Sequence, residues 1–218
     1  MDYLQKLIRE GEHQQLDFKF EISDARKIAR TMVAFSNTDG GRLLVGVKDN
    51  GAIAGVRSEE EIFMLEGAAE MYCRPVVKFK AIRWEVGPKT VVEIIINPGN
   101  KRPYFALEPD GKWLVYIRVK DQNLLANKIL MKVWERQKEG VETTVQFSGV
   151  EEFLLKYLAL HESISFSGFC KVADIPKFLA ETILINLLSL DLLVMDFSEK
   201  GVLYRLNKDS FEQDLPFI

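Results

Sequence analysis

A strand, a helix and a second strand follow one another closely within residues 16–47, and this succession constrains the fold more than any other feature of the sequence. Residues 16–20 alternate apolar and charged side chains, which predicts a strand with Asp17 and Lys19 on the same face. Apolar residues then recur at helical spacing over residues 23–37, a pattern typical of an amphipathic helix. The segment therefore predicts an α+β domain in which helices flank a sheet.

Turns and further strands continue this pattern as far as residue 138. Asp39-Gly40-Gly41 is a turn in front of a buried strand at 43–47, and Asp49-Asn50-Gly51 is a hairpin signal. Further strands are expected at residues 76–84, 90–96, 104–107 and 113–119, and further helices at 58–72 and 124–138. We expect a mixed or antiparallel sheet and a single domain over residues 1–138.

The remaining chain has a different pattern. The polar residues 139–148 look like a linker, and residues 208–218 form a tail without a clear signal. Between them, residues 149–207 contain three apolar helical stripes followed by two short strands, which is the order of a winged helix-turn-helix domain. Its recognition helix, at about 176–190, has few side chains of the kind that read DNA, so docking or dimerisation is an equal interpretation.

Composition and charge exclude several classes of protein. The net charge of −3 argues against a strongly basic coat for nucleic acid, so any such site must be a local patch. Cys73 and Cys170 lie far apart, which excludes a disulfide framework and a thiolate zinc site as the organising principle. No apolar run reaches the roughly 18 residues of a spanning helix, and the first residues are charged and amphipathic. We expect a cytoplasmic protein without a membrane partner.

Four motifs in order resemble the Schlafen AlbA-like domain. They are Phe18-Lys19 after the acids at 12 and 17, Ala34 to Thr38 before Asp39-Gly40-Gly41, Gly46 to Gly51, and Tyr116-Ile117-Arg118-Val119. The resemblance covers about residues 8–138. It implies a nucleic-acid-binding domain, and the winged helix behind it implies a transcription-regulator-like protein.

The resemblance also implies an enzymatic alternative. The vertebrate Schlafens in this family cleave transfer and ribosomal RNA with three carboxylates, and the matching residues here are Glu12, Asp17 and Asp49. Asp17 stands where Glu is more usual and is shorter by one methylene. Converging carboxylates hold Mg²⁺ or Mn²⁺, which activates water for attack on a phosphodiester. The alternative function is therefore a metal-dependent endoribonuclease acting on structured RNA.

Basic side chains interleaved with these motifs are the candidates for contact with DNA or structured RNA. They are Lys19, Arg42, Lys48, Lys101, Arg102 and Arg118. A solvated or salt-bridged strand face would explain the same residues without a ligand. Gly40-Gly41 leads into a strand rather than a helix and no phosphate-loop motif is present, so ATP is not expected as a cofactor. A second alternative is a protein-interaction adaptor that forms homodimers through its winged helix.

Overall fold

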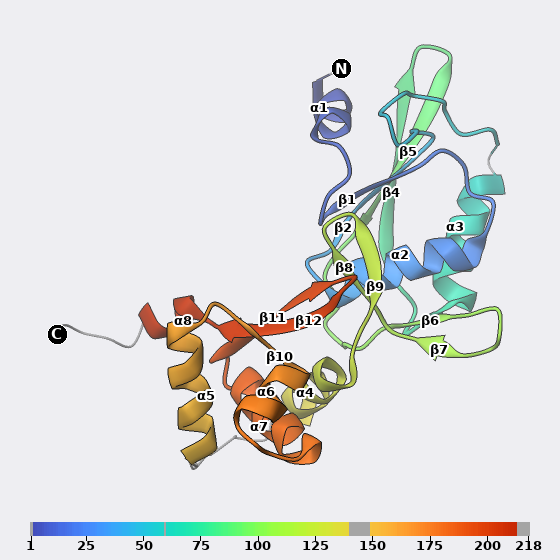
Figure 1. Cartoon of the computed structure of the whole chain (residues 1–218). Coiled ribbons are helices and arrows are strands. Elements are labelled where there is room, and N and C mark those ends of the chain that lie inside the picture. Colours follow the sequence, from blue (N-terminus) through green and yellow to red (C-terminus); the bar gives the residue numbers. More distant parts are fainter. Residues whose placement is uncertain (1, 59, 140–148, 213–218) are drawn as a thin grey trace. The chain divides into compact units, whose positions relative to one another are not determined.

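The computed structural model describes residues 2–58, 60–139 and 149–212. The chain divides into two compact units between Ala126 and Asn127 (Figure 1). The expected linker at 139–148 lies, apart from its first residue, outside the described residues, as does the tail beyond residue 212. Within the part of the chain that the structure describes, no helix has the length and apolar character needed to cross a membrane.

A four-stranded mixed sheet forms the centre of the first unit. Its strand order is β1 (Leu16–Lys19), β2 (Gly41–Val45), β5 (Lys89–Ile96) and β4 (Phe79–Val86). Strands β1 and β2 are parallel, whereas the other two pairs are antiparallel. The helix between β1 and β2 supplies the crossover that a parallel pair requires. The expected α+β class with a mixed sheet and flanking helices is confirmed.

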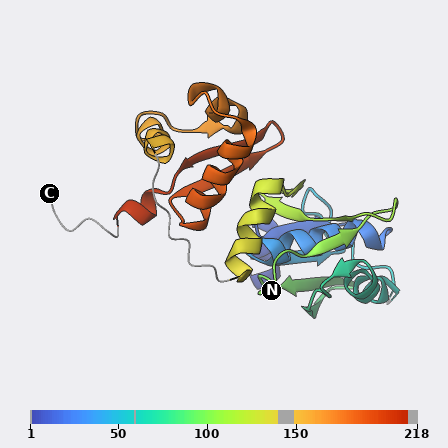
Figure 2. The ribbon, with the colours of Figure 1, turned by 90° about the horizontal axis from the view of Figure 1, so that it is seen from below.

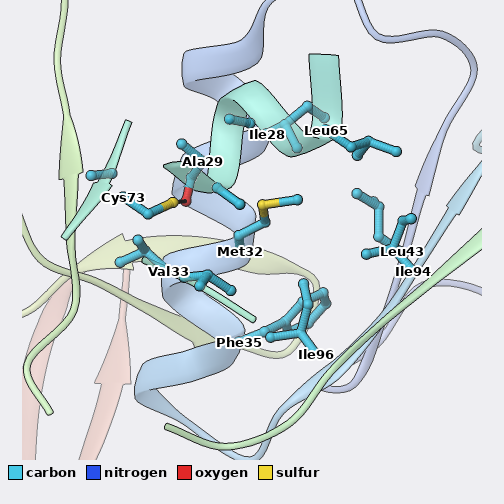
Figure 3. Close-up of a cluster of buried hydrophobic side chains, with 14 of the residues drawn as sticks. Ile28, Ala29, Met32, Val33, Phe35, Leu43, Leu65, Cys73, Ile94 and Ile96 are labelled. Atoms are coloured by element: carbon cyan, nitrogen blue, oxygen red, sulfur yellow. Dashed lines mark hydrogen bonds between the residues drawn. The ribbon is translucent and has the colours of Figure 1, made fainter. Parts of the chain in front are cut away.

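Helices cover both faces of this sheet. Helices α2 (Ala25–Asn37) and α3 (Glu60–Met71) bury one face, and α1 (Asp2–Glu10) packs on the other through Leu4 and Leu7. Figure 3 shows side chains of α2, α3 and the strands meeting in the larger cluster. Helix α2 begins after Asp24, whose carboxylate accepts a hydrogen bond from the Arg26 backbone at 2.9 Å.

Short strands complete the first unit. A three-stranded sheet contains β3 (Cys73–Arg74), β6 (Phe105–Leu107) and β7 (Trp113–Leu114), and a separate hairpin contains β8 (Tyr116–Val119) and β9 (Gln122–Leu125). The single strand expected at 113–119 was wrong, because the chain changes sheets at Val115. The helix expected from residue 124 was also wrong at its start, because residues 124 and 125 pair with β8.

The second unit combines helices with a small antiparallel sheet (Figure 2). In chain order its elements are α4 (Lys128–Glu139), α5 (Gly149–Leu160), β10 (Ile164–Ser165), α6 (Phe166–Val172), α7 (Lys177–Ser189), β11 (Leu193–Ser198), β12 (Gly201–Leu206) and α8 (Lys208–Glu212). The sheet order is β10, β12, β11.

Helix α4 belongs to this second unit and not to the first domain that was expected to end at residue 138. Ile129 and Val133 lie in the same buried cluster as the apolar residues of α7. Lys132 contacts Glu181 of α7 at 2.5 Å, and Lys128 contacts the same carboxylate at 3.2 Å. These contacts move the boundary between the units from residue 138 to residue 126.

Candidate nucleic-acid interface

The carboxylate of Asp17 lies in the interior between two cations. Its side chain is 4% exposed and contacts Lys19 Nζ at 2.7 Å and Arg118 Nη2 at 3.0 Å. The alternation of β1 puts Asp17 and Lys19 on one face, as the sequence predicts. A buried carboxylate is tolerated only when it is paired and hydrogen-bonded. Asp17 therefore acts as a structural anchor between β1 and β8.

Arg118 supplies the other half of this anchor. Its side chain is 1% exposed, and its guanidinium donates to Leu16 O at 3.3 Å and to Asn123 Oδ1 at 3.1 Å besides pairing with Asp17. The structure thus places Arg118, which the sequence led us to expect at a nucleic-acid contact, in the interior beside Asp17.

Glu12 joins Asp17, but Asp49 does not complete a metal site with them. The Phe18 backbone donates to Glu12 Oε1 at 2.8 Å. Partial burial and the neighbouring Asp17 raise the pKa of the Glu12 carboxyl. Asp49 is exposed on the turn after Val47. Among the described residues, no group of three or more His, Cys, Asp or Glu side chains is arranged to hold a metal ion.

These observations do not fit Mg²⁺ or Mn²⁺ held by Glu12, Asp17 and Asp49. A divalent ion needs several converging oxygen ligands. Lys19 and Arg118 already contact the Asp17 oxygens and would compete with a metal ion for them.

Arg42 is also engaged by a buried acid. Its Nε lies 3.0 Å from Glu93 Oε1, and Glu93 is fully buried. The Glu93 carboxylate further accepts hydrogen bonds from the Tyr3 hydroxyl at 2.8 Å and from Trp84 Nε1 at 2.9 Å. The Arg42 side chain remains 41% exposed, so one edge of it still reaches the surface.

Lys48 lies on a tight turn that points it to solvent. The Lys48 backbone accepts from Gly51 N at 2.7 Å and donates to Ala52 O at 3.0 Å, which confirms the hairpin turn. The chain enters this turn at Gly46, whose φ is +92° and where an added Cβ would lie 2.8 Å from the Gly55 carbonyl carbon. Only glycine fits there without strain. Lys48 Nζ lies 5.2 Å from the centre of the Phe20 ring.

The loop at residues 97–103 presents a second group of basic side chains. Lys101 is exposed, whereas Arg102 is half-buried and donates to Thr38 O at 3.1 Å. The loop borders a cavity of about 530 Å³ that Lys78 also lines. The other lining residues are Ser36, Pro75, Val76, Asn97, Pro98, Gly99, Asn100 and Tyr104. This hollow combines cationic and amide side chains, which suit a phosphate backbone.

Reading the sequence misses three further residues of the first unit. Lys78 precedes β4 and shares the cavity with Lys101. The alternation predicts Phe20 on the apolar face of the first strand, but Phe20 is 38% exposed just beyond the end of β1. The Arg57 guanidinium lies 5.4 Å from the centre of the same ring. The sequence signal for Phe20 was an aromatic residue directly after a lysine at a strand end.

The fold and these surfaces define an α+β domain with neutralised acids inside and cations at its turns. The family model described as Schlafen, AlbA_2 matches residues 12–127, which is more than half of the chain. The chain therefore belongs to the Schlafen AlbA_2 family.

The chain is similar to several solved structures, whereas no curated protein matches it. The DIP2311 protein from Corynebacterium diphtheriae has 18% identity and a TM-score of 0.44, covering 70% of this chain and 31% of its own. The N-terminal domain of a RecG-related protein from Nitrosomonas europaea has 20% identity and a TM-score of 0.40, covering 59% of this chain and 97% of its own. The chain thus spans less than a third of the Corynebacterium protein.

Proposed function

We propose that this chain is a cytoplasmic nucleic-acid-binding protein whose first unit contacts the phosphate backbone. The observation that carries the proposal is the separation of charges within the first unit. Asp17 and Glu93 are buried and paired, whereas Lys48 and Lys101 extend to solvent. Exposed cations at turns contact phosphates and release counterions, which drives binding. Family membership supports the same role.

Fluorescence anisotropy of the full chain with duplex DNA and with an RNA hairpin at low salt tests this proposal. We expect binding that weakens steeply with salt, and a double variant Lys48→Gln, Lys101→Gln whose log–log salt slope is smaller by about 2, or about 1 per lost contact. The matched control is Lys112→Gln, because Lys112 is exposed in the same unit but pairs with Asp110 at 2.6 Å. Absence of binding at low salt would reject the function.

We infer that the second unit is a winged helix-turn-helix module, which with the first unit would make a transcription-regulator-like protein. The order α5, β10, α6, α7, β11, β12 and the three-stranded sheet support this inference. Near the start of α7, Lys177 and Phe178 are exposed, but Glu181 is held by Lys128 and Lys132. This face favours docking or dimerisation over base reading. A monomeric mass by light scattering would count against a homodimer.

The proximity of Glu12 to Asp17 favours a metal-dependent endoribonuclease as a second candidate, whereas the position of Asp49 away from them disfavours it. Two neighbouring carboxyls, one with a raised pKa, are a common starting point for an acidic active site. Incubation of a structured RNA with Mn²⁺ separates the candidates. We expect no cleavage by the wild-type chain. Cleavage that Asp49→Ala abolishes would establish the nuclease with Asp49 as a ligand.

A further inference from the structure

An exposed phenylalanine with two cations beside its ring lies at the carboxyl ends of the parallel strands β1 and β2. Phe20 directly follows β1 and is 38% exposed, whereas Leu16 and Phe18 in the same strand are each 1% exposed. The ring is therefore left at the surface by a strand whose other apolar side chains are in the core. A large exposed aromatic group without a core role suggests a contact surface.

The two cations come from different segments and meet at this one ring. Lys48 Nζ lies 5.2 Å and Arg57 Cζ 5.4 Å from the ring centre. The Arg57 side chain is 68% exposed and is oriented by Glu21, whose carboxylate lies 2.9 Å from Nη1. Both cations are held close to the ring and retain access to solvent. We define Phe20, Lys48 and Arg57 as the aromatic platform.

We propose that the aromatic platform binds an unpaired base of single-stranded nucleic acid, with the base stacked on Phe20 and the flanking phosphates near Lys48 and Arg57. The inference rests on the proposed function and specifies its ligand. Bases of a duplex are stacked on each other and cannot lie on a protein ring, whereas unpaired bases stack on aromatic side chains beside a cationic track.

A hollow next to Arg57 extends the surface that the bound nucleic acid would contact. It has a volume of about 210 Å³, and its lining includes Arg57, Arg83 and Ser58 as well as Glu85, whose carboxylate accepts a hydrogen bond from the Thr90 hydroxyl at 2.9 Å. Phosphate oxygens accept hydrogen bonds readily from guanidinium groups such as those of Arg57 and Arg83. Glu21 pairs with Arg57, the exposed Asp49 follows Lys48, and Glu85 lines the hollow, so this surface is less positive than its basic residues alone would make it. Stacking on Phe20 therefore contributes more than charge does to the preference for single-stranded nucleic acid.

Anisotropy of the full chain with labelled dT12, rU12 and a 12-base-pair duplex tests this inference. We expect Phe20→Ala to weaken binding of the single strands about tenfold, which is a stacking loss of typical size, and to leave duplex binding unchanged. Phe20→Tyr retains the ring and should bind like wild type. The comparison of dT12 with rU12 distinguishes DNA from RNA as the source of the base.

Control variants keep the test decisive. Phe63→Ala removes another exposed ring of the first unit, 68% exposed on α3, and should change nothing. Phe20→Leu preserves apolar bulk without an aromatic face and should lose as much as Phe20→Ala, which covers the case in which the alanine variant does not fold. Equal losses on single strands and duplex, or no loss in Phe20→Leu, would overturn the platform. A wild-type chain that binds only duplex rejects the platform alone, and one that binds nothing rejects the proposed function as well.

Discussion

The interior ion pairs decide what the charged residues of the family motifs do. Asp17 and Arg118 are separated by 101 positions in the chain, yet their side chains meet in a buried contact at 3.0 Å. Because each charge compensates the other, the pair joins β1 to β8 and is removed from contact with solvent. Motif residues of this kind stabilise the domain, and the ligand must be recognised by others.

Removing Arg118 should destabilise the first unit strongly. Arg118→Met leaves the Asp17 carboxylate buried with Lys19 alone, and we expect a loss of about 3 kcal/mol in the free energy of unfolding. Urea denaturation measures this loss. Lys101→Met, at an exposed position, should change the unfolding free energy by less than about 0.5 kcal/mol. A loss in Arg118→Met as small as that of the control would show that the pair does not anchor the fold.

A second ion pair predicts part of the response to acid. Hydrogen bonds from Arg30 and Tyr116 lower the pKa of Glu108 from its usual 4.5, and burial with the Glu108 bond raises the pKa of Tyr116 to about 12. The stability that Glu108 contributes is therefore present above pH 4.5 and is lost as the pH falls through the lower folded pKa. Glu108→Gln should lower the urea midpoint at pH 7 and have a smaller effect at pH 3. Equal effects at both pH values would contradict this assignment.

The sequence predicts the contacts between residues close together in the chain, but not those between distant residues. The alternation in β1 was sufficient to put Asp17 beside Lys19, because strand geometry fixes it. Arg118 reaches the same carboxylate through tertiary packing, which periodicity does not encode. Phe20 was misassigned for a related reason, since β1 ends at Lys19 and the alternation no longer determines the direction of the next side chain.

Among the elements, α4 shows where reading the sequence fails. Leu124 and Leu125 fit a helical stripe equally well, but they belong to β9, and Asn127 then caps α4 by accepting from Leu130 N at 2.8 Å. A short apolar run before a helix cap does not show whether its residues form the end of a strand or the start of a helix. The elements with long, regular patterns, α2 and α7, were predicted well.

Because α4 packs in the second unit, a cavity in α4 should destabilise that unit. Ile129→Ala removes a buried contact with the α7 cluster, and we expect the second unit to lose about 2–3 kcal/mol. Hydrogen exchange by mass spectrometry should show faster exchange in α7 and unchanged exchange in α2. The surface variant Glu135→Ala should leave both unchanged. Faster exchange in α2 alone would assign α4 to the first unit.

For the whole molecule, the central claim is that nucleic acid binds to the first unit at its cationic turns. The net charge of −3 disfavours non-specific attraction, so binding must depend on local groups such as Lys48 and Lys101. Binding of this kind depends on few charged contacts and is sensitive to salt.

Hydrogen exchange of the full chain with and without a bound oligonucleotide tests this claim most directly. We predict slower exchange at residues 46–51 and 97–103 in the complex, and unchanged exchange at residues 177–182 of α7. Slower exchange confined to α7 and the β11–β12 hairpin would contradict it and assign binding to the second unit.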